Sequence, residues 1–325
     1  MTDHPDPSPT PEAPDLPQGV SVVVPVYNSE ESLTPLVEQL AELFRGRGQA
    51  FEVLLVNDGS RDRSWAVVSD LATKHPFVRG FDLMRNFGQH NALLCGVRAA
   101  RYAVVVTMDD DLQHPPAEVP KLLAKLDEGC DVVYGAPREL PHGLLRNLAS
   151  KITKIALQTA MGAETARRVS AFRAFRTRTR EAFAHFSGSF VSLDVLLTWG
   201  TVRFAHEFVR HEPRRLGQSN YTTRKLVTHA FNMITGFSTL PLQAASVLGF
   251  GLTVFGLALL AYVVVMYFAV HEAPAGFPFL ASVISLFSGA QLFSLGMIGE
   301  YLGRVHFRLL DKPTYVVRQT EGGKG

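Results

Sequence analysis

The chain has 325 residues, a formal net charge of +2 and a sequence pI of about 8.5. This length allows one large domain or two modest ones, and the nearly balanced charge gives no support for a nucleic-acid partner. Hydrophobic residues make up 46% of the chain, and most of the excess over a soluble enzyme lies after residue 240. The two cysteines, Cys95 and Cys130, lack a CxxC partner or metal-ligand spacing, so we expect buried free thiols.

The first part of the chain predicts a disordered tail followed by an α/β domain. Residues 1–19 are rich in Pro and Asp and lack an apolar run, so they resemble neither a signal peptide nor a membrane span. Beyond them, helical patterns alternate with the strand-like segments VSVVVPVY, FEVLLVND, VRGFDLM, YAVVVTMDDD and CDVVYGAP. This alternation predicts a Rossmann-like, mostly parallel sheet with helices on both faces, in a domain over residues 20–235.

The later part of this domain, residues 144–235, has amphipathic helical patterns. The segments HGLLRNLASKITKIALQTAMG and YTTRKLVTHAFNMITGF interleave apolar residues with Lys and Arg at helical spacing. Two interpretations stay open: packed helices with a solvated face, or amphipathic helices that lie in a membrane interface.

Two apolar runs close the chain. Ala244–Val270 and Phe279–Gly299 contain no charged residue, and about 20 apolar residues suffice to span a bilayer core. A buried core helix rarely reaches this length without a charge. We therefore predict a unit over residues 236–304 with transmembrane helices at about 244–270 and 279–301.

The charges around this unit predict its orientation. Lys and Arg flank the pair on both sides but are absent from the linker HEAPAGFP, so the positive-inside rule places both flanks in the cytoplasm. The sequence thus predicts a multi-pass protein of the cell membrane, with its α/β domain and a C-terminal tail over 305–325 in the cytoplasm.

An acidic stretch, Asp109-Asp110-Asp111-Leu112-Gln113, follows the strand-like segment YAVVVTM. Adjacent carboxylates repel one another unless a cation or hydrogen-bond donors compensate them. Mg²⁺ and Mn²⁺ prefer oxygen ligands and commonly join carboxylates to substrate phosphates. Taken alone, the stretch is equally compatible with a metal site and with a solvated acidic turn.

Polar clusters follow the other predicted strands as well. They are PVYN with Glu30 close behind, VNDGS around Asp58, and RNFG beginning at Arg85. Separately, these clusters could be a capped helix start, an Asp-Gly turn and a loop salt bridge. Because ligands bind at the carboxyl ends of parallel strands, the clusters together indicate one binding site. There Asp58 could accept a hydrogen bond from a ribose hydroxyl or from a base N–H.

These motifs resemble those of family 2 glycosyltransferases with the GT-A fold. The resemblance covers residues 20–318 and rests on VSVVVPVYNSEE, VNDGSRD, RNFGQH, MDDDLQHPP, VVYGAPRE, FRAFR, RRLGQSNY, GAQLFSLGMIGEYLGRV and KPTYVV. The order of the motifs and the hairpin are similar to those of polyprenyl-phosphate glycosyltransferases. The resemblance implies Mg²⁺- or Mn²⁺-dependent transfer of one sugar, with inversion, from a nucleotide-diphosphate sugar (UDP rather than GDP) to an undecaprenyl-type phosphate.

By position, the resemblance also implies roles for individual residues, although each arginine could instead be a surface or interfacial charge. Nucleotide-sugar contacts would be Pro25, Tyr27, Glu30, Asp58, Arg85, Asp109, Asp110 and Arg214. Metal ligands would be Asp109, Asp111 and Gln113. Acceptor-phosphate contacts would be Arg138, Ser170 and Arg173, and catalytic residues Asp111, Arg138 and Arg173.

The chain departs from the family pattern at Ala171, where relatives often carry an acid, at Asn220, where a lysine is usual, and at Asp110, often alanine. A phosphate monoester with a second pKa of about 6 is already an anionic nucleophile at neutral pH. A lipid-phosphate acceptor therefore needs no general base, and Ala171 is compatible with activity.

Two other functions stay open. A processive polysaccharide synthase would carry a Q-x-x-R-W stretch and more membrane spans, which the sequence lacks. A non-catalytic membrane scaffold would have no reason to keep the acidic stretch. A homo-oligomer is compatible with each of these functions.

Overall fold

The computed structural model describes residues 16–137, 168–188, 191–212, 240–270, 276–309 and 312–323. Its strands are β1 Val20–Val26, β2 Phe51–Asn57, β3 Val78–Leu83, β4 Val104–Thr107, β5 Val132–Pro137, β6 Arg173–Arg176, β7 Phe204–Val209 and β8 Val317–Glu321. They form one eight-stranded sheet in the order β7-β5-β6-β4-β1-β2-β3-β8. β1 is parallel to β2 and β4, β2 to β3, and β5 to β7, whereas β6 and β8 are antiparallel to their neighbours.

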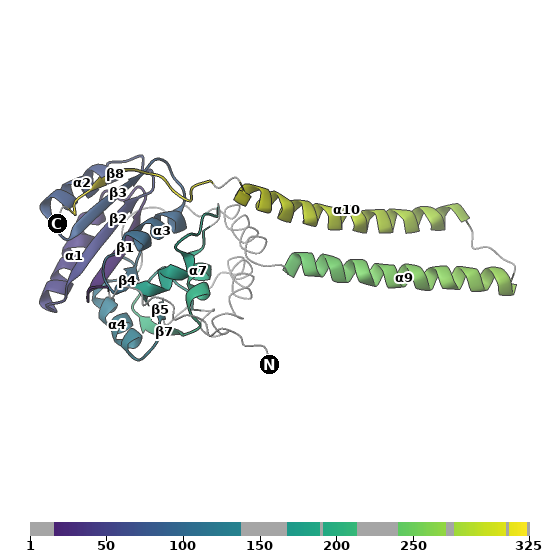
Figure 1. The fold of residues 1–325 in the computed structure, drawn as a ribbon, viewed down its shortest axis with the longest axis horizontal. Coiled ribbons are helices and arrows are strands. Elements are labelled where there is room, and N and C mark those ends of the chain that lie inside the picture. The colour runs from purple at the N-terminus through teal and green to yellow at the C-terminus, as the bar shows by residue number, and fades with distance from the viewer. Residues whose placement is uncertain are drawn as a thin grey trace, which may run out of the picture.

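Helices cover both faces of this sheet (Figure 1). They are α1 Leu33–Gly46, α2 Ser64–Lys74, α3 Gln89–Ala99, α4 Val119–Asp127 and α7 Leu193–Gly200, with 3-10 helices at Pro116–Glu118 and Thr177–Phe183. α1, α2 and α4 pack on the face that carries Val22 and Val24, and α3 and α7 on the face of Val23. Since both faces are covered, β1 is buried along its whole length, as its largely apolar sequence predicts. The predicted α/β fold with a mostly parallel sheet is confirmed.

The part of the chain after β5 differs from the prediction of amphipathic helices. Within the described residues it contributes β6, α7 and β7, so two of its segments are strands. In β6, the side chains alternate between the two faces of the sheet with a period of about two. The arginines of FRAFR obscure this period in the sequence. The segments 142–162 and 221–237, on which the helical prediction rested, lie outside the described residues, as do residues 1–15 of the predicted tail.

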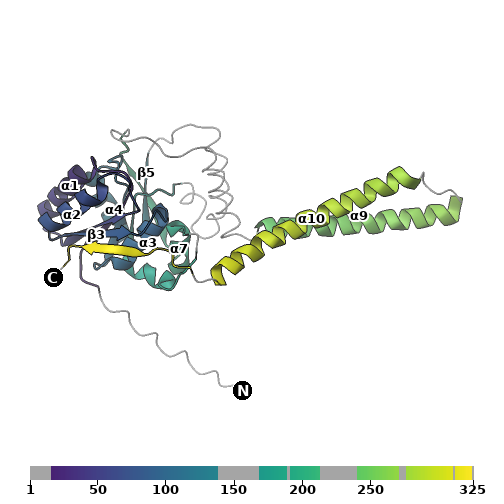
Figure 2. The same ribbon diagram turned by 90° about the horizontal axis from the view of Figure 1, so that it is seen from above.

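Two long helices, α9 Leu240–Val270 and α10 Gly276–Leu309, extend from the α/β domain and pack side by side (Figures 1 and 2). They are 31 and 34 residues long and expose large apolar side chains, among them Phe250, Leu257 and Leu292. Counting only the described residues, no helix combines the length and the apolarity needed to cross a membrane. The transmembrane hairpin therefore stays a prediction.

The C-terminal segment is not a simple tail. Residues 305–309 continue α10, and Val317–Glu321 add β8 to the edge of the sheet beside β3. The sequence VVRQTE is too short and too polar to indicate a strand by itself, because an edge strand buries few of its side chains. β8 therefore depends on its pairing with β3.

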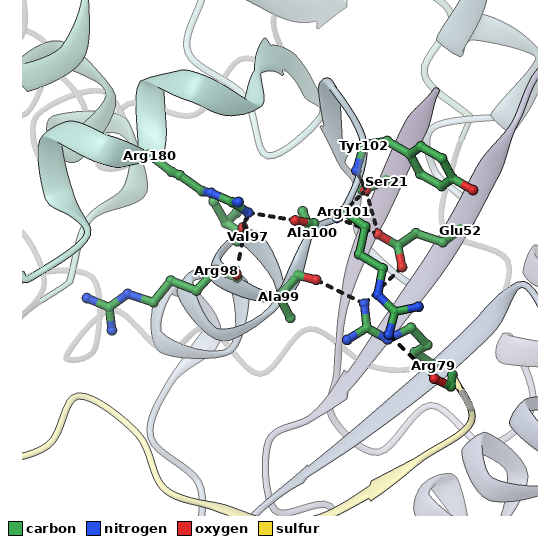
Figure 3. A network of polar contacts seen from close by, with 11 residues as sticks. Ser21, Glu52, Arg79, Val97, Arg98, Ala99, Ala100, Arg101, Tyr102 and Arg180 are labelled. Carbon is green, nitrogen blue, oxygen red and sulfur yellow. Dashed lines mark hydrogen bonds and ion pairs between the residues drawn. The ribbon is translucent and has the colours of Figure 1, made fainter. Parts of the chain in front are cut away.

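A buried carboxylate ties the strands together at their amino-terminal ends (Figure 3). The side chain of Glu52 is 4% exposed and accepts hydrogen bonds from Ser21 Oγ (2.7 Å), Arg79 Nη1 (2.9 Å) and the backbone N–H of Arg101 (2.8 Å). Arg79 Nη1 also donates to the carbonyl of Ala99 (2.9 Å). Glu52 thus joins β1, β2 and β3 to the turn after α3.

Replacing Glu52 by alanine should lower the free energy of unfolding by about 3 kcal/mol, because it leaves the mostly buried guanidinium of Arg79 without its counter-ion. Urea denaturation followed by tryptophan fluorescence would measure this loss. Glu128→Ala is the matched control, since Glu128 forms a surface pair with Lys125 and should cost less than about 1 kcal/mol. Equal losses in the two variants would contradict the prediction.

Candidate active site

The loops that carry the predicted polar clusters meet at one end of the sheet, where the parallel strands have their carboxyl ends. The parallel register pairs Val26 with Asn57 and Asn57 with Asp82, and it pairs Val23 with Thr107. The hydrogen bonds continue past the strand ends, because the backbone N–H of Asp58 donates to the carbonyl of Val26 (2.9 Å). The loops after β1, β2, β3 and β4 therefore leave the sheet side by side.

Asp58 braces the loop after β3. Its side chain is 3% exposed, and its two carboxylate oxygens accept the backbone N–H groups of Phe87 (2.7 Å) and Gly88 (2.8 Å). Burial raises the pKa of Asp58, while those two N–H groups and the nearby Arg85 oppose the rise. Asn86 Nδ2 also donates to the Asp58 carbonyl (3.0 Å). The predicted contact of Asp58 with the nucleoside stays a prediction in addition to this bracing role.

Gly59 is required by the close approach of the same two loops. Its φ is +65°, and a Cβ there would lie 2.6 Å from the backbone nitrogen of Asn86. A left-handed backbone angle favours glycine, and no side chain fits in that space. The VNDGS motif thus brings the loops after β2 and β3 into contact.

The loop after β1 is joined to the loop after β2. Asn28, which has a φ of 55°, accepts the backbone N–H of Arg61 with Oδ1 (2.8 Å), and Glu30 Oε2 accepts that of Arg63 (2.8 Å). Pro25 is the penultimate residue of β1, and Tyr27 beyond it is 36% exposed. Glu30 therefore has a structural role in addition to its predicted contact with the nucleoside, whereas Tyr27 is exposed.

The three carboxylates after β4 interact with different parts of the site. Asp109 Oδ1 accepts Gln89 Nε2 of α3 (2.7 Å), and Asp111 Oδ1 accepts the backbone N–H of Gln113 (3.1 Å). Burial raises the pKa of Asp110 to about 6, although hydrogen bonds from the Ser29 side chain and the Tyr27 backbone lower it. Asp110 therefore holds the loop after β1.

The donor set of this loop suits a hard divalent cation. Asp109, Asp111 and Gln113 supply carboxylate and amide oxygens, which Mg²⁺ and Mn²⁺ prefer. Leu112 between them has a φ of 59°, an unusual backbone conformation for leucine, and such strain often accompanies a functional site. No cluster of three or more His, Cys, Asp or Glu side chains forms a metal cage within the described residues, so other oxygens would have to complete the coordination.

The residues that follow β7 hold the acidic loop from the other side. The carbonyl of Gln113 accepts the backbone N–H of Glu212 (2.8 Å), and the ring of His114 stacks on His211 with centroids 4.8 Å apart. Burial lowers the pKa of His114 to about 4, so the ring is neutral at physiological pH. No local pattern in the sequence indicates this contact. Arg214, the predicted donor contact two residues further on, and Arg138 lie outside the described residues.

Arg173 lies beneath the acidic loop. Its guanidinium is 1% exposed, forms an ion pair with Asp194, and donates from Nε to Thr107 Oγ1 (3.0 Å). The hydroxyl of Tyr134 also donates to Asp194 (3.0 Å). Although burial opposes its charge, the neighbouring Asp194 raises the pKa of Arg173. In this conformation the guanidinium is enclosed, so its predicted contact with an acceptor phosphate stays a prediction.

Ser170 and Arg85 occupy different settings. Ser170 Oγ accepts the backbone N–H of Phe172 (3.1 Å) and so shapes the start of β6. Arg85 is exposed, with its guanidinium carbon 4.5 Å from the centroid of the Phe87 ring. Arg85 is thus placed at the rim of the site, where a solute could reach it.

Comparisons with known proteins show the family of the chain. The model of "Glycosyl transferase family 2" matches residues 21–187. An undecaprenyl-phosphate 4-deoxy-4-formamido-L-arabinose transferase of Yersinia enterocolitica is 32% identical over 308 residues, which are 94% of this chain and 94% of that protein. The chain belongs to glycosyl transferase family 2. It is a glycosyltransferase, as its motifs predict.

Other members extend the likeness over nearly the whole chain. The transferase of the same name from Pectobacterium carotovorum is 34% identical over 93% of this chain and 94% of that protein, and its counterpart in Shewanella sediminis is 34% identical over 92% and 91%. The order of the motifs and the apolar hairpin also predict a close likeness to this transferase, with dolichyl-phosphate mannose synthase as a more distant relative. The likeness to this transferase is confirmed.

Solved structures of similar shape come from two further glycosyltransferases. Glucosyl-3-phosphoglycerate synthase of Mycobacterium tuberculosis, in complex with Mn²⁺, UDP and glucosyl-3-phosphoglycerate, has a TM-score of 0.47 and 17% identity, covering 67% of this chain and 78% of that one. Mannosyl-3-phosphoglycerate synthase of Rubrobacter xylanophilus has a TM-score of 0.48 and 17% identity, covering 66% and 72%.

Proposed function

We propose that this glycosyltransferase transfers a single sugar from a nucleotide-diphosphate sugar to a polyprenyl phosphate of the undecaprenyl type. The observation that carries the proposal is the gathering of the acidic loop and three further polar loops at one edge of the sheet. The choice of acceptor is supported by relatives named as undecaprenyl-phosphate transferases, whose likeness includes the region of α9 and α10.

The donor would lie across the four loops. Asp109, Asp111 and Gln113 would hold Mg²⁺ or Mn²⁺, which when bound there offsets the charge that develops on a diphosphate leaving group. Tyr27, exposed after β1, and Arg85, exposed in the loop that Asp58 braces, are placed to contact the nucleoside and its phosphates. UDP is favoured over GDP, and Arg214 is the proposed further contact with the diphosphate.

The acceptor phosphate would attack directly, with inversion at the anomeric carbon. A phosphate monoester is an anionic nucleophile at neutral pH, so the chain needs no base at Ala171. Arg138, Ser170 and Arg173 are the proposed contacts for that phosphate, because arginine binds phosphate oxygens through two N–H groups at once. These residues would fix the acceptor in line with the leaving group.

The hydrophobic helices would bring the enzyme to its lipid acceptor. We propose that α9 and α10 anchor the protein in the cell membrane with its α/β domain in the cytoplasm. The support lies in the uncharged runs Ala244–Val270 and Phe279–Gly299 and in the Lys and Arg residues that flank them.

A panel of nucleotide sugars assayed with undecaprenyl phosphate tests the proposal. Purified full-length protein in detergent should release UDP or GDP only when Mg²⁺ or Mn²⁺ is present, and mass spectrometry should show one sugar added to the lipid. Products carrying several sugars would favour the processive synthase. If the protein neither binds nor releases a nucleotide with either metal, the non-catalytic scaffold would be favoured instead.

A further inference from the structure

The strand that follows α10 has an irregularity at Arg318. In the antiparallel pairing of β8 with β3, Asp82 faces Gln319 and Leu83 faces Val317, so Arg318 between them has no opposite residue on β3. Such a β-bulge redirects the side chain of the extra residue. Figure 2 shows β8 running along β3 at the border of the sheet.

A series of polar contacts joins the redirected side chain of Arg318 to the candidate donor site. Arg318 donates from Nη1 to Asp82 Oδ2 (3.1 Å) and from Nη2 to the carbonyl of Met84 (2.8 Å). The other carboxylate oxygen of Asp82 accepts Asn57 Nδ2 (2.7 Å). Asn57 and Asp82 are both almost fully buried, and Asn57 directly precedes Asp58.

We infer that Arg318 is a positioning residue for the nucleotide-sugar donor, an inference that rests on the proposed function for the identity of the ligand. Its contacts fix the end of β2 through Asn57 and the start of the loop after β3 through Met84. These are the two loops that Asp58 joins. β8 therefore links the end of α10 to the geometry of the donor site, so the C-terminal segment takes part in donor binding without touching the donor.

A buried thiol reports whether the C-terminal segment stays in place. Cys95 on α3 is 3% exposed and hydrogen-bonds to Tyr315, whose ring lies under the guanidinium of Arg98. Burial raises the pKa of Cys95 to about 12, so it should react with thiol reagents very slowly while Tyr315 covers it. Detachment of the segment would expose this thiol. Cys130 is half-buried, which corrects the prediction that both thiols are buried, and Cys130→Ser removes its competing signal.

The decisive variant is Arg318→Gln in full-length protein that carries Cys130→Ser. We expect the donor KM to rise by about tenfold with kcat within about twofold, since one charged hydrogen-bonding partner is lost away from the reacting atoms. Amide hydrogen exchange in peptides covering residues 84–88 should accelerate in the protein without substrate, while Cys95 stays protected. Arg318→Lys keeps the positive charge near Asp82 and should therefore reverse part of the rise in the donor KM.

Arg101→Gln is the control, because the Arg101 side chain contacts the same segment at the carbonyl of Gly323 (3.4 Å), away from the donor loops. It should leave KM and exchange unchanged. The inference is overturned if Arg318→Gln leaves exchange at residues 84–88 unchanged, or if it exposes Cys95, which would indicate detachment of the strand. Because exchange is measured without substrate, it decides the inference even if the wild-type protein fails to transfer sugar, a failure that counts against the proposed function alone.

Discussion

Replacing Asp111 by asparagine should lower the rate of sugar transfer by about a thousandfold, which corresponds to about 4 kcal/mol of transition-state stabilisation. Asparagine has the same shape, and its Oδ1 can still accept the backbone N–H of Gln113, which now lies 3.1 Å from the carboxylate. The loop should therefore keep its fold. What the variant loses is the negative charge that a divalent cation would need.

The measurement is initial-rate transfer to undecaprenyl phosphate over a range of Mn²⁺ concentrations. If Asp111 is a metal ligand, the variant should need more Mn²⁺ and recover part of its rate at high concentration. Asp70→Asn on α2 is the control, because Asp70 forms an exposed pair with Lys74 far along the chain from the acidic loop, and its loss should not change the rate. Wild-type rates in Asp111→Asn, with the same demand for Mn²⁺, would refute the metal assignment. Membrane association should be the same in both variants.

The sequence was sufficient to predict that polar loops gather at one end of the sheet, because the signals for these loops are local. Asp58 and Asp109 each follow a strand whose apolar run is evident, and the parallel arrangement of consecutive strands brings their carboxyl ends together. What local patterns cannot show is which atom each side chain contacts. Asp58, predicted to contact the nucleoside, accepts two backbone N–H groups of a loop about thirty residues away.

The contacts that the sequence did not predict are those between residues far apart along the chain. Arg173 contacts Thr107, 66 residues away, and the Gln113 carbonyl contacts His211, 98 residues away. β6 enters the sheet antiparallel between β4 and β5, an insertion that no periodicity in FRAFR could reveal. Asp194 was detectable in one respect, since a lone carboxylate within the apolar VSLDVLL suggests a buried partner.

Removing that carboxylate should be strongly destabilising. Asp194→Ala leaves the fully buried guanidinium of Arg173 without its counter-ion and should lower the free energy of unfolding by about 4 kcal/mol. Tyr134→Phe deletes only the hydroxyl that donates to Asp194 and should cost about 1 kcal/mol. Urea denaturation of the two variants would measure the difference. Similar losses would mean that the ion pair adds little beyond one hydrogen bond.

A paired replacement separates the stability of this cluster from its proposed role in transfer. Combining Arg173→Met with Asp194→Leu removes both charges and fills the space with apolar atoms, so most of the lost stability should return. If Arg173 contacts the acceptor phosphate, the stable double variant should still show a KM for undecaprenyl phosphate raised by about tenfold or more, because a charged hydrogen bond to phosphate is absent. If the double variant transfers sugar at the wild-type KM, the role of Arg173 is to support the acidic loop from below. A different basic side chain would then bind the acceptor phosphate.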